Sequence, residues 1–91
     1  MATIAVWVKI DGEHLADSLL GGRDRLDGAD GEVVFDFSSV RRVDPGALRA
    51  MEEVARAADE KTVKVVLRGV NIDVYKVLKL VNLTPRFSFM N

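Results

Sequence analysis

Hydrophobic residues recur along this chain in patterns that predict four strands. Residues 3–10, TIAVWVKI, alternate with the period of two that is typical of a strand. Residues 33–37, VVFDF, form the continuous apolar run of a buried strand, and residues 62–68, TVKVVLR, predict a third one. Phe87 and Phe89 alternate with polar positions near the C-terminus, which predicts a short edge strand within residues 86–91.

Three further segments have helical spacing. Leucines predict a helix over residues 14–26, although Gly21 and Gly22 each weaken it by about 1 kcal/mol relative to alanine and could break it. A third helix is predicted over residues 72–81, with Asn71 as its N-cap and with Asn82 and Pro85 after its end. Its inward-facing residues are expected to be Val74, Tyr75, Leu78 and Val81.

The middle helix has the clearest start signal. Asp44 is a good N-cap, and Pro45 suits the first helical position. An apolar stripe follows, made of Leu48, Met51, Ala55 and Ala58, and a charged face lies opposite, made of Arg49, Glu52, Glu53, Arg56 and Glu60. Arg49 and Glu53, and likewise Glu52 and Arg56, are spaced as i,i+4 ion pairs.

Strands that alternate with helices predict a single α/β domain over residues 1–91, with a largely parallel or mixed sheet. Hydrophobic residues make up 48% of the chain and charged residues 30%, which excludes a disordered protein. A net charge of −1 gives no reason to expect nucleic acid or an anionic membrane as partner. No signal peptide and no run long enough to insert into a membrane is recognised. A small domain without cysteine, and hence without disulfides, suits the cytoplasm, so we expect a cytoplasmic protein.

Side chains that could carry chemistry do not form a recognisable catalytic set. The chain has no cysteine, and its one histidine, His14, has no cluster of ligating residues beside it, so no metal or cofactor is expected. Ser38 and Ser39 are expected to bond to local backbone, and Asp44 to cap a helix. No glycine-rich phosphate loop is present, and Trp7 and the phenylalanines are interpreted as core residues. We therefore expect no enzymatic activity.

The stretch VVFDFSSVRRVDPGALRAMEEVARAA resembles the strand, loop and helix at the centre of STAS domains, the family of bacterial anti-sigma-factor antagonists. The later VKVVLRGVNIDVYKVLKLVNLTP is similar to the STAS subunit of the lipid-asymmetry ABC transport system of Gram-negative bacteria. The resemblance implies a STAS-like mixed sheet of four to five strands with helices mainly on one side. It is firm over about two thirds of the chain and looser over the first third.

Two departures from the family pattern have consequences. The antagonist turn carries a phosphorylatable serine or threonine, which would lie here at Pro45 or Gly46, and neither has a hydroxyl. A phosphorylation switch at this turn is therefore chemically excluded, and Ser38 and Ser39 are the nearby hydroxyls that a kinase could modify. The family's first strand is also missing before residue 3, which leaves a sheet edge that a partner or a second copy could pair with.

What the resemblance implies is a non-catalytic module that binds another protein, either a transporter ATPase or a kinase-like anti-sigma regulator. The contact surface would be the Asp44 turn and the exposed face of the following helix, namely Arg41, Arg42, Asp44, Pro45, Gly46, Arg49, Glu52, Glu53 and Arg56. The alternative is a regulatory domain that binds a small ligand or nucleotide at the helix N-terminus near Asp44 and the two arginines.

Overall fold

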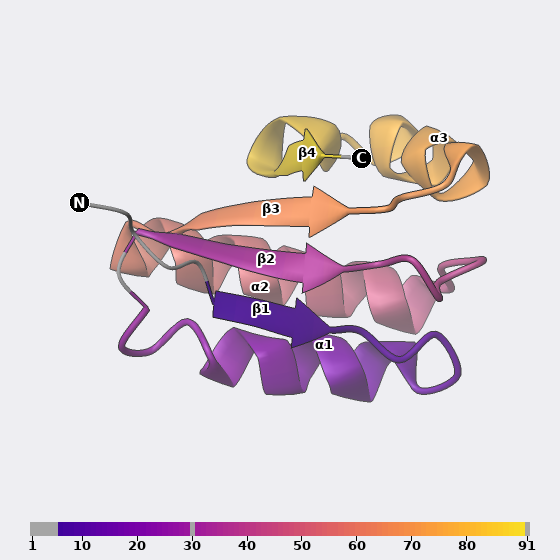
Figure 1. Cartoon of the computed structure of the whole chain (residues 1–91). Helices are drawn as coiled ribbons and strands as arrows, with labels where there is room; N and C mark the ends of the chain where they lie inside the picture. Colours follow the sequence, from indigo (N-terminus) through magenta and orange to yellow (C-terminus); the bar gives the residue numbers. More distant parts are fainter. Residues whose placement is uncertain (1–5, 30, 91) are drawn as a thin grey trace.

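The computed structural model describes residues 6–29 and 31–90. Four strands alternate with three helices, and a short 3-10 turn precedes the last strand (Figure 1). The elements in chain order are β1 (Val6–Lys9), α1 (Leu15–Asp24), β2 (Glu32–Asp36), α2 (Pro45–Lys61), β3 (Lys64–Arg68), α3 (Ile72–Leu80), the turn Thr84–Arg86, and β4 (Ser88–Met90). The predicted order is confirmed, while residues 3–5 of the first predicted strand and residue 91 of the last lie outside the described residues.

The sheet is parallel in all three strand pairings that the structure describes. Its order is β1-β2-β3-β4, and the registers place Val8 beside Phe35, Phe35 beside Leu67, and Leu67 beside Phe89. Crossovers between parallel strands are nearly always right-handed, so this consecutive order puts α1, α2 and α3 on one face. Buried residues of all three helices join one core with that face, which confirms the predicted architecture.

The opposite face of the sheet carries no helix among the described residues (Figure 1). Trp7, Val34, Val66 and Ser88 follow one another across that face in register. Trp7 is 52% exposed, so its assignment to the core is wrong. In a strand, successive side chains point to opposite faces, and Trp7 alternates with the core residue Val8.

Both helix starts that the sequence predicts at capping residues are confirmed. The Asp44 carboxylate accepts a hydrogen bond from the N–H of Ala47 at 2.7 Å, and the Asn71 side chain accepts one from Val74 at 2.7 Å. The predicted start of the third strand is wrong by two residues. Thr62 has a left-handed conformation with φ of 56° and closes the C-terminus of α2, so the strand begins at Lys64.

Helix α1 runs through its two glycines without a break. Gly22 is buried against the ring of Phe35, where an added Cβ would lie 2.8 Å from the ring's Cζ atom. At Gly21, the preceding residue, an added Cβ would point into open space. Gly22 therefore lets α1 approach the sheet closely, and this contact offsets the low helix propensity of glycine.

The inward face of α3 is narrower than predicted. Val74 and Leu78 are buried, but Tyr75 and Val81 are both exposed, so their assignment as inward-facing is wrong. Tyr75 instead packs edge-on against Phe89 of β4, with ring centroids 5.2 Å apart. A nine-residue helix at the sheet margin buries one line of residues spaced by four, and Tyr75 lies beside that line.

Candidate functional site at the start of helix α2

The first turn of α2 is exposed and rigidly built. The backbone of Asp44 is extended, its carbonyl accepts from the N–H of Leu48 at 3.0 Å, and its side chain caps the helix. Pro45 occupies the first helical position, where no N–H is required. Asp44 and Pro45 are exposed and Gly46 is half-buried, so a partner can reach this turn.

The loop from β2 to α2 is tied to two other elements. The Ser39 hydroxyl donates to the carbonyl of Ile10 at 2.9 Å. The Asn71 amide donates to the carbonyls of both Val40 and Arg41 at 3.2 Å. The Ser39 hydroxyl does bond to backbone, but its partner Ile10 lies 29 residues away, so the prediction of a local backbone partner is wrong for Ser39. Ser38 and Ser39 are both exposed. These bonds hold Arg41 and Arg42 in place beside the α2 turn.

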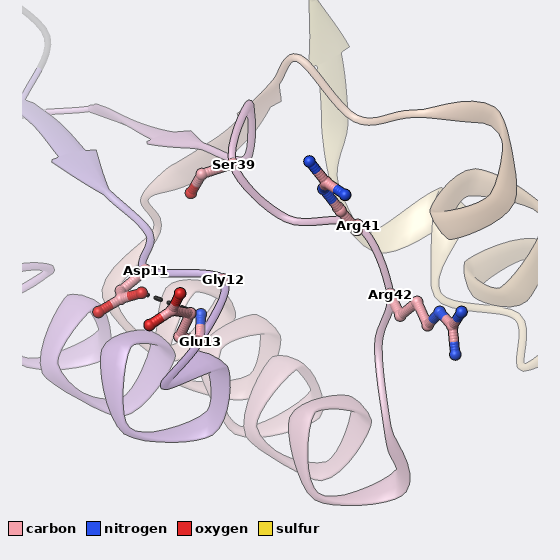
Figure 2. Close-up of a pocket in the computed structure, with 6 residues that line it drawn as sticks. All are labelled: Asp11, Gly12, Glu13, Ser39, Arg41 and Arg42. Atoms are coloured by element: carbon pink, nitrogen blue, oxygen red, sulfur yellow. Dashed lines mark hydrogen bonds between the residues drawn. The ribbon is translucent and has the colours of Figure 1, made fainter.

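A cleft of about 610 Å³ opens between this loop and the loop that follows β1 (Figure 2). It is lined by Asp11, Gly12, Glu13, Ser39, Arg41 and Arg42. Sequence reasoning did not assign Asp11, Gly12 or Glu13 to the site. The topology could have indicated these three residues, because loops that follow neighbouring parallel strands meet at the carboxyl edge of the sheet. Gly12 is needed there, since a Cβ would overlap the carbonyl oxygen of Ser39.

Charges on the two sides of the cleft are opposite but do not pair. Two hydrogen bonds, from the Glu13 N–H at 2.9 Å and from His14 at 3.1 Å, hold the pKa of Asp11 below its usual range. The same contact with Asp11 raises the pKa of His14, the residue just before α1. Within residues 6–29 and 31–90, His14 belongs to no cluster of metal-ligating residues. Arg42 is directed away from the acidic side (Figure 2), and neither arginine forms an ion pair with a described residue.

The outward face of α2 differs from the predicted one in its ion pairs. The expected pairs Arg49–Glu53 and Glu52–Arg56 are absent among the described residues. Glu53 instead accepts from Arg56 at 2.9 Å and lies 3.6 Å from Arg23 of α1. Glu53 is half-buried at the junction of the two helices, so it belongs to the α1–α2 contact and not to the free face. Arg49, Glu52 and Arg56 remain exposed on that face.

The two aspartates near the loop have separate structural tasks. Asp36 accepts from the N–H of Ser38 at 2.9 Å, which lowers its pKa, and Arg68 at 3.7 Å adds to the effect. Asp44 caps α2. The two carboxylates therefore do not form an acid and base pair. In the part of the chain that the structure describes, no helix is long and apolar enough to cross a membrane.

The family model described as "Mlab, STAS domain" matches residues 4–85, so this chain belongs to the STAS domain family. No curated protein sequence is similar enough to this chain to count as a match.

Solved structures show the same fold. The solution structure of the protein TM1081 has a TM-score of 0.75 and 16% sequence identity, covering 93% of this chain and 72% of that one. A crystal structure of TM1081 from Thermotoga maritima, described as a candidate anti-sigma factor antagonist, has a TM-score of 0.68 and 19% identity, covering 100% of this chain and 75% of that one. At these identities the likeness concerns the fold alone.

Proposed function

We propose that this chain is a non-catalytic regulatory module that binds another protein through the start and outward face of α2. The observation that carries the proposal is the exposed turn at Asp44, flanked by arginines that form no ion pair with a described residue. Positive charge is presented to a partner by Arg41, Arg42 and Arg49, and negative charge on the same face by Glu52. Mixed charges of this kind set orientation and specificity at an interface.

Binding through this turn would be constitutive. No residue from Asp44 to Leu48 carries a hydroxyl, so a kinase cannot add phosphate there. Regulation would then depend on the amount of partner, or on modification of the exposed Ser38. Ser39 is a poorer substrate, because its hydroxyl is engaged with Ile10. Mass spectrometry of the protein from its own cell tests this step, and stoichiometric phosphate on Ser38 or Ser39 would contradict constitutive binding.

Two classes of partner fit a STAS module of this kind. One is the ATPase of an ABC transporter, and the other is a kinase-like anti-sigma regulator. The resemblance of the C-terminal half to a transporter-associated STAS subunit supports the first class, and the fold shared with a candidate anti-sigma factor antagonist supports the second. We propose that the protein acts in the cytoplasm, where both classes are found.

Site-specific photo-crosslinking in the native cell would identify the partner and test the surface together. A photoreactive amino acid replaces Arg49 on α2 in one variant, and Arg25 at the end of α1 in the matched control. Both positions are exposed, so neither replacement should disturb the fold. We expect one dominant crosslinked ATPase or regulator from position 49 and none from position 25. A crosslink from position 25 alone would overturn the assignment of the surface.

The purified partner then allows a quantitative test by calorimetric titration. The double variant Arg49→Glu with Glu52→Arg keeps the net charge and leaves Glu53 bound to Arg23 and Arg56. Reversed charges at an interface meet like charges, so affinity should fall at least about tenfold, which corresponds to about 1.4 kcal/mol. Unchanged affinity with an intact fold would show that this face of α2 is only solvated.

The cleft of Figure 2 is the observation that favours the second candidate, a site for a small ligand or nucleotide. Its charge argues against a phosphate group. The carboxylates of Asp11 and Glu13 line the same cleft as Arg41 and Arg42, so their repulsion of an anion opposes the attraction by the arginines. Titration of nucleotides against the labelled protein separates the two candidates, because saturable shifts at Arg41 and Arg42 would support the ligand site.

A further inference from the structure

Exposed apolar side chains gather on α3 and on the strand beside it. Ile72 is 73% exposed and Leu80 is 84% exposed, and both lie on a helix that is anchored from beneath by Val74 and Leu78. Tyr75 and Met90 are also exposed beside them. We call these four residues, together with Lys76 and Lys79, the α3 patch. Ile72, Tyr75 and Met90 line one hollow, and Leu80 lies two helical turns from Ile72 with Lys76 between them. Single exposed apolar residues are ordinary, but a group of large ones on one face marks an interaction surface.

The α3 patch has a shaped and rigid concavity at one end. A hollow of about 270 Å³ lies between the start of α3 and β4, and is lined by Val70, Asn71, Ile72, Tyr75, Phe89 and Met90. Its walls are fixed, because Asn71 caps α3 and Tyr75 packs against Phe89. The N–H of Gly69 also donates to the carbonyl of Met90 at 3.2 Å. A preformed apolar hollow accepts one large apolar side chain with little loss of entropy.

Two lysines and one aspartate, Asp73, are exposed among the apolar residues of α3, so positive charge is in slight excess there. Ile72, Lys76 and Leu80 are spaced by four and therefore share one line along the exposed side of α3, with Lys79 next to it. Both lysines are exposed, and neither forms an ion pair with any residue in the described ranges. An occupant with carboxylates spaced to meet Lys76 and Lys79 therefore complements this line, while Asp73 at its side offsets part of the positive charge.

We propose that the α3 patch is a second docking surface, and that its occupant is an acidic, amphipathic segment of another protein. An apolar side chain of that segment fills the hollow beside Tyr75, and its carboxylates meet Lys76 and Lys79. The proposal is independent of the α2 surface, because none of the residues of the α3 patch belongs to the proposed α2 contact.

Two other occupants fit the observations less well. A second copy of this chain, related by a two-fold axis at the middle of α3, would place Lys76 against the same residue of the other copy, which is repulsive. The same arrangement would place Asp73 near Lys79 of the other copy, so the ultracentrifuge measurement below decides this case. An anionic membrane usually requires clusters of about four to eight basic residues, whereas the α3 patch offers two. A flat lipid surface also makes no use of a hollow that matches one side chain.

Selection from a random-sequence peptide display library on the immobilised full chain tests the occupant's chemistry. We expect selected peptides to combine acidic residues with large apolar ones. A synthesised peptide from this set, titrated into the nitrogen-15-labelled chain, should shift the amide signals of Ile72, Tyr75 and Leu80. Peptides that lack acidic residues, or that shift signals elsewhere on the chain, would overturn the proposal.

Matched variants complete the test. Ile72→Ser with Leu80→Ser, and separately Lys76→Glu with Lys79→Glu, should each weaken peptide binding at least about tenfold, or about 1.4 kcal/mol. All four positions are exposed, so the fold should persist. The control Arg25→Glu, and the α2 variant Arg49→Glu with Glu52→Arg, should bind the peptide normally. Two further measurements test the other occupants. If the unaltered chain sediments with phosphatidylglycerol vesicles and the Ile72→Ser, Leu80→Ser variant does not, the proposal is overturned in favour of lipid. If the unaltered chain dimerises in the ultracentrifuge and this variant does not, it is overturned in favour of a second copy.

Discussion

The guanidinium carbon of Arg68 lies 5.8 Å from the centre of the Trp7 ring, although β2 separates their two strands. The contact therefore crosses the helix-free face of the sheet, above the register position of Val34. Val34 is only 2% exposed on that face, and we infer that the pair contributes to its shielding. Arg68 also lies 3.7 Å from Asp36, its register partner on β2.

Replacing Arg68 by alanine should loosen this contact. An exposed cation–π pair contributes about 0.5–1 kcal/mol, so the free energy of unfolding should fall by roughly that amount. Trp7 is the single tryptophan, and its fluorescence should become more accessible to quenching by the neutral molecule acrylamide. Arg25→Ala, which removes an exposed arginine on α1, is the control. Identical quenching of both variants would show that Arg68 does not shield the ring.

The two adjacent glycines of α1 should respond to alanine in opposite directions. Gly21→Ala meets no atom within 4 Å and should stabilise the protein by about 0.5–1 kcal/mol through helix propensity. Gly22→Ala forces a methyl group against the fully buried Phe35 and should cost about 1–3 kcal/mol, as overpacking does. Chemical denaturation of both variants measures the difference, and equal effects would show that α1 can shift away from the sheet without cost.

Leu78 and Leu80 provide a matched pair on α3. Leu78 is fully buried, and its replacement by alanine should cost about 2–5 kcal/mol, the usual range for a core leucine. Leu80 is exposed, so Leu80→Ala should change stability by no more than about 0.5 kcal/mol. Chemical denaturation of both variants measures the two changes in the free energy of unfolding. A small loss of stability in Leu78→Ala would contradict the packing of α3 on the sheet.

The pKa of His14 should depend on Asp11. The hydrogen bond with Asp11 raises the pKa of His14 above its ordinary value of 6.5, so the protonated form is favoured in the folded protein. The stabilisation is complete below the unfolded pKa and is lost as the pH rises through the folded one. Since His14 is the single histidine, one NMR titration curve reports its pKa.

Asp11→Asn should lower that pKa towards 6.5, because the neutral side chain no longer favours the charged imidazole. Glu13→Gln is the control, since Glu13 contributes a smaller attraction and its loss should shift the curve less. A larger shift for Glu13→Gln than for Asp11→Asn would contradict the assignment of the partner.

Local signals predicted α2 and α3 well, because the residues that start these two helices bond to their own backbone. Asp44 and Asn71 cap the helices that the sequence assigns to them. The errors concern relations between elements. Glu53 pairs with Arg56 of its own helix and with Arg23 of α1 instead of with Arg49, and the contact with Arg23 could not be read from the spacing along α2. Likewise, Asp11 and Ser39 meet at one cleft only because β1 and β2 end at the same edge of the sheet.

The parallel sheet also determines how this chain must fold. Val6 pairs with Val33, Val33 with Val65, and Leu67 with Phe89, so each pairing joins residues more than twenty positions apart. None of these strand pairs is a hairpin, and a pair cannot form until the intervening helix has returned the chain to its starting edge. Each closure costs loop entropy before any sheet contact compensates for it, which is typical of slow folding. During synthesis, a strand pair can therefore form only after the helix between its two strands has been made, and β4 is the last of the four strands that can join the sheet.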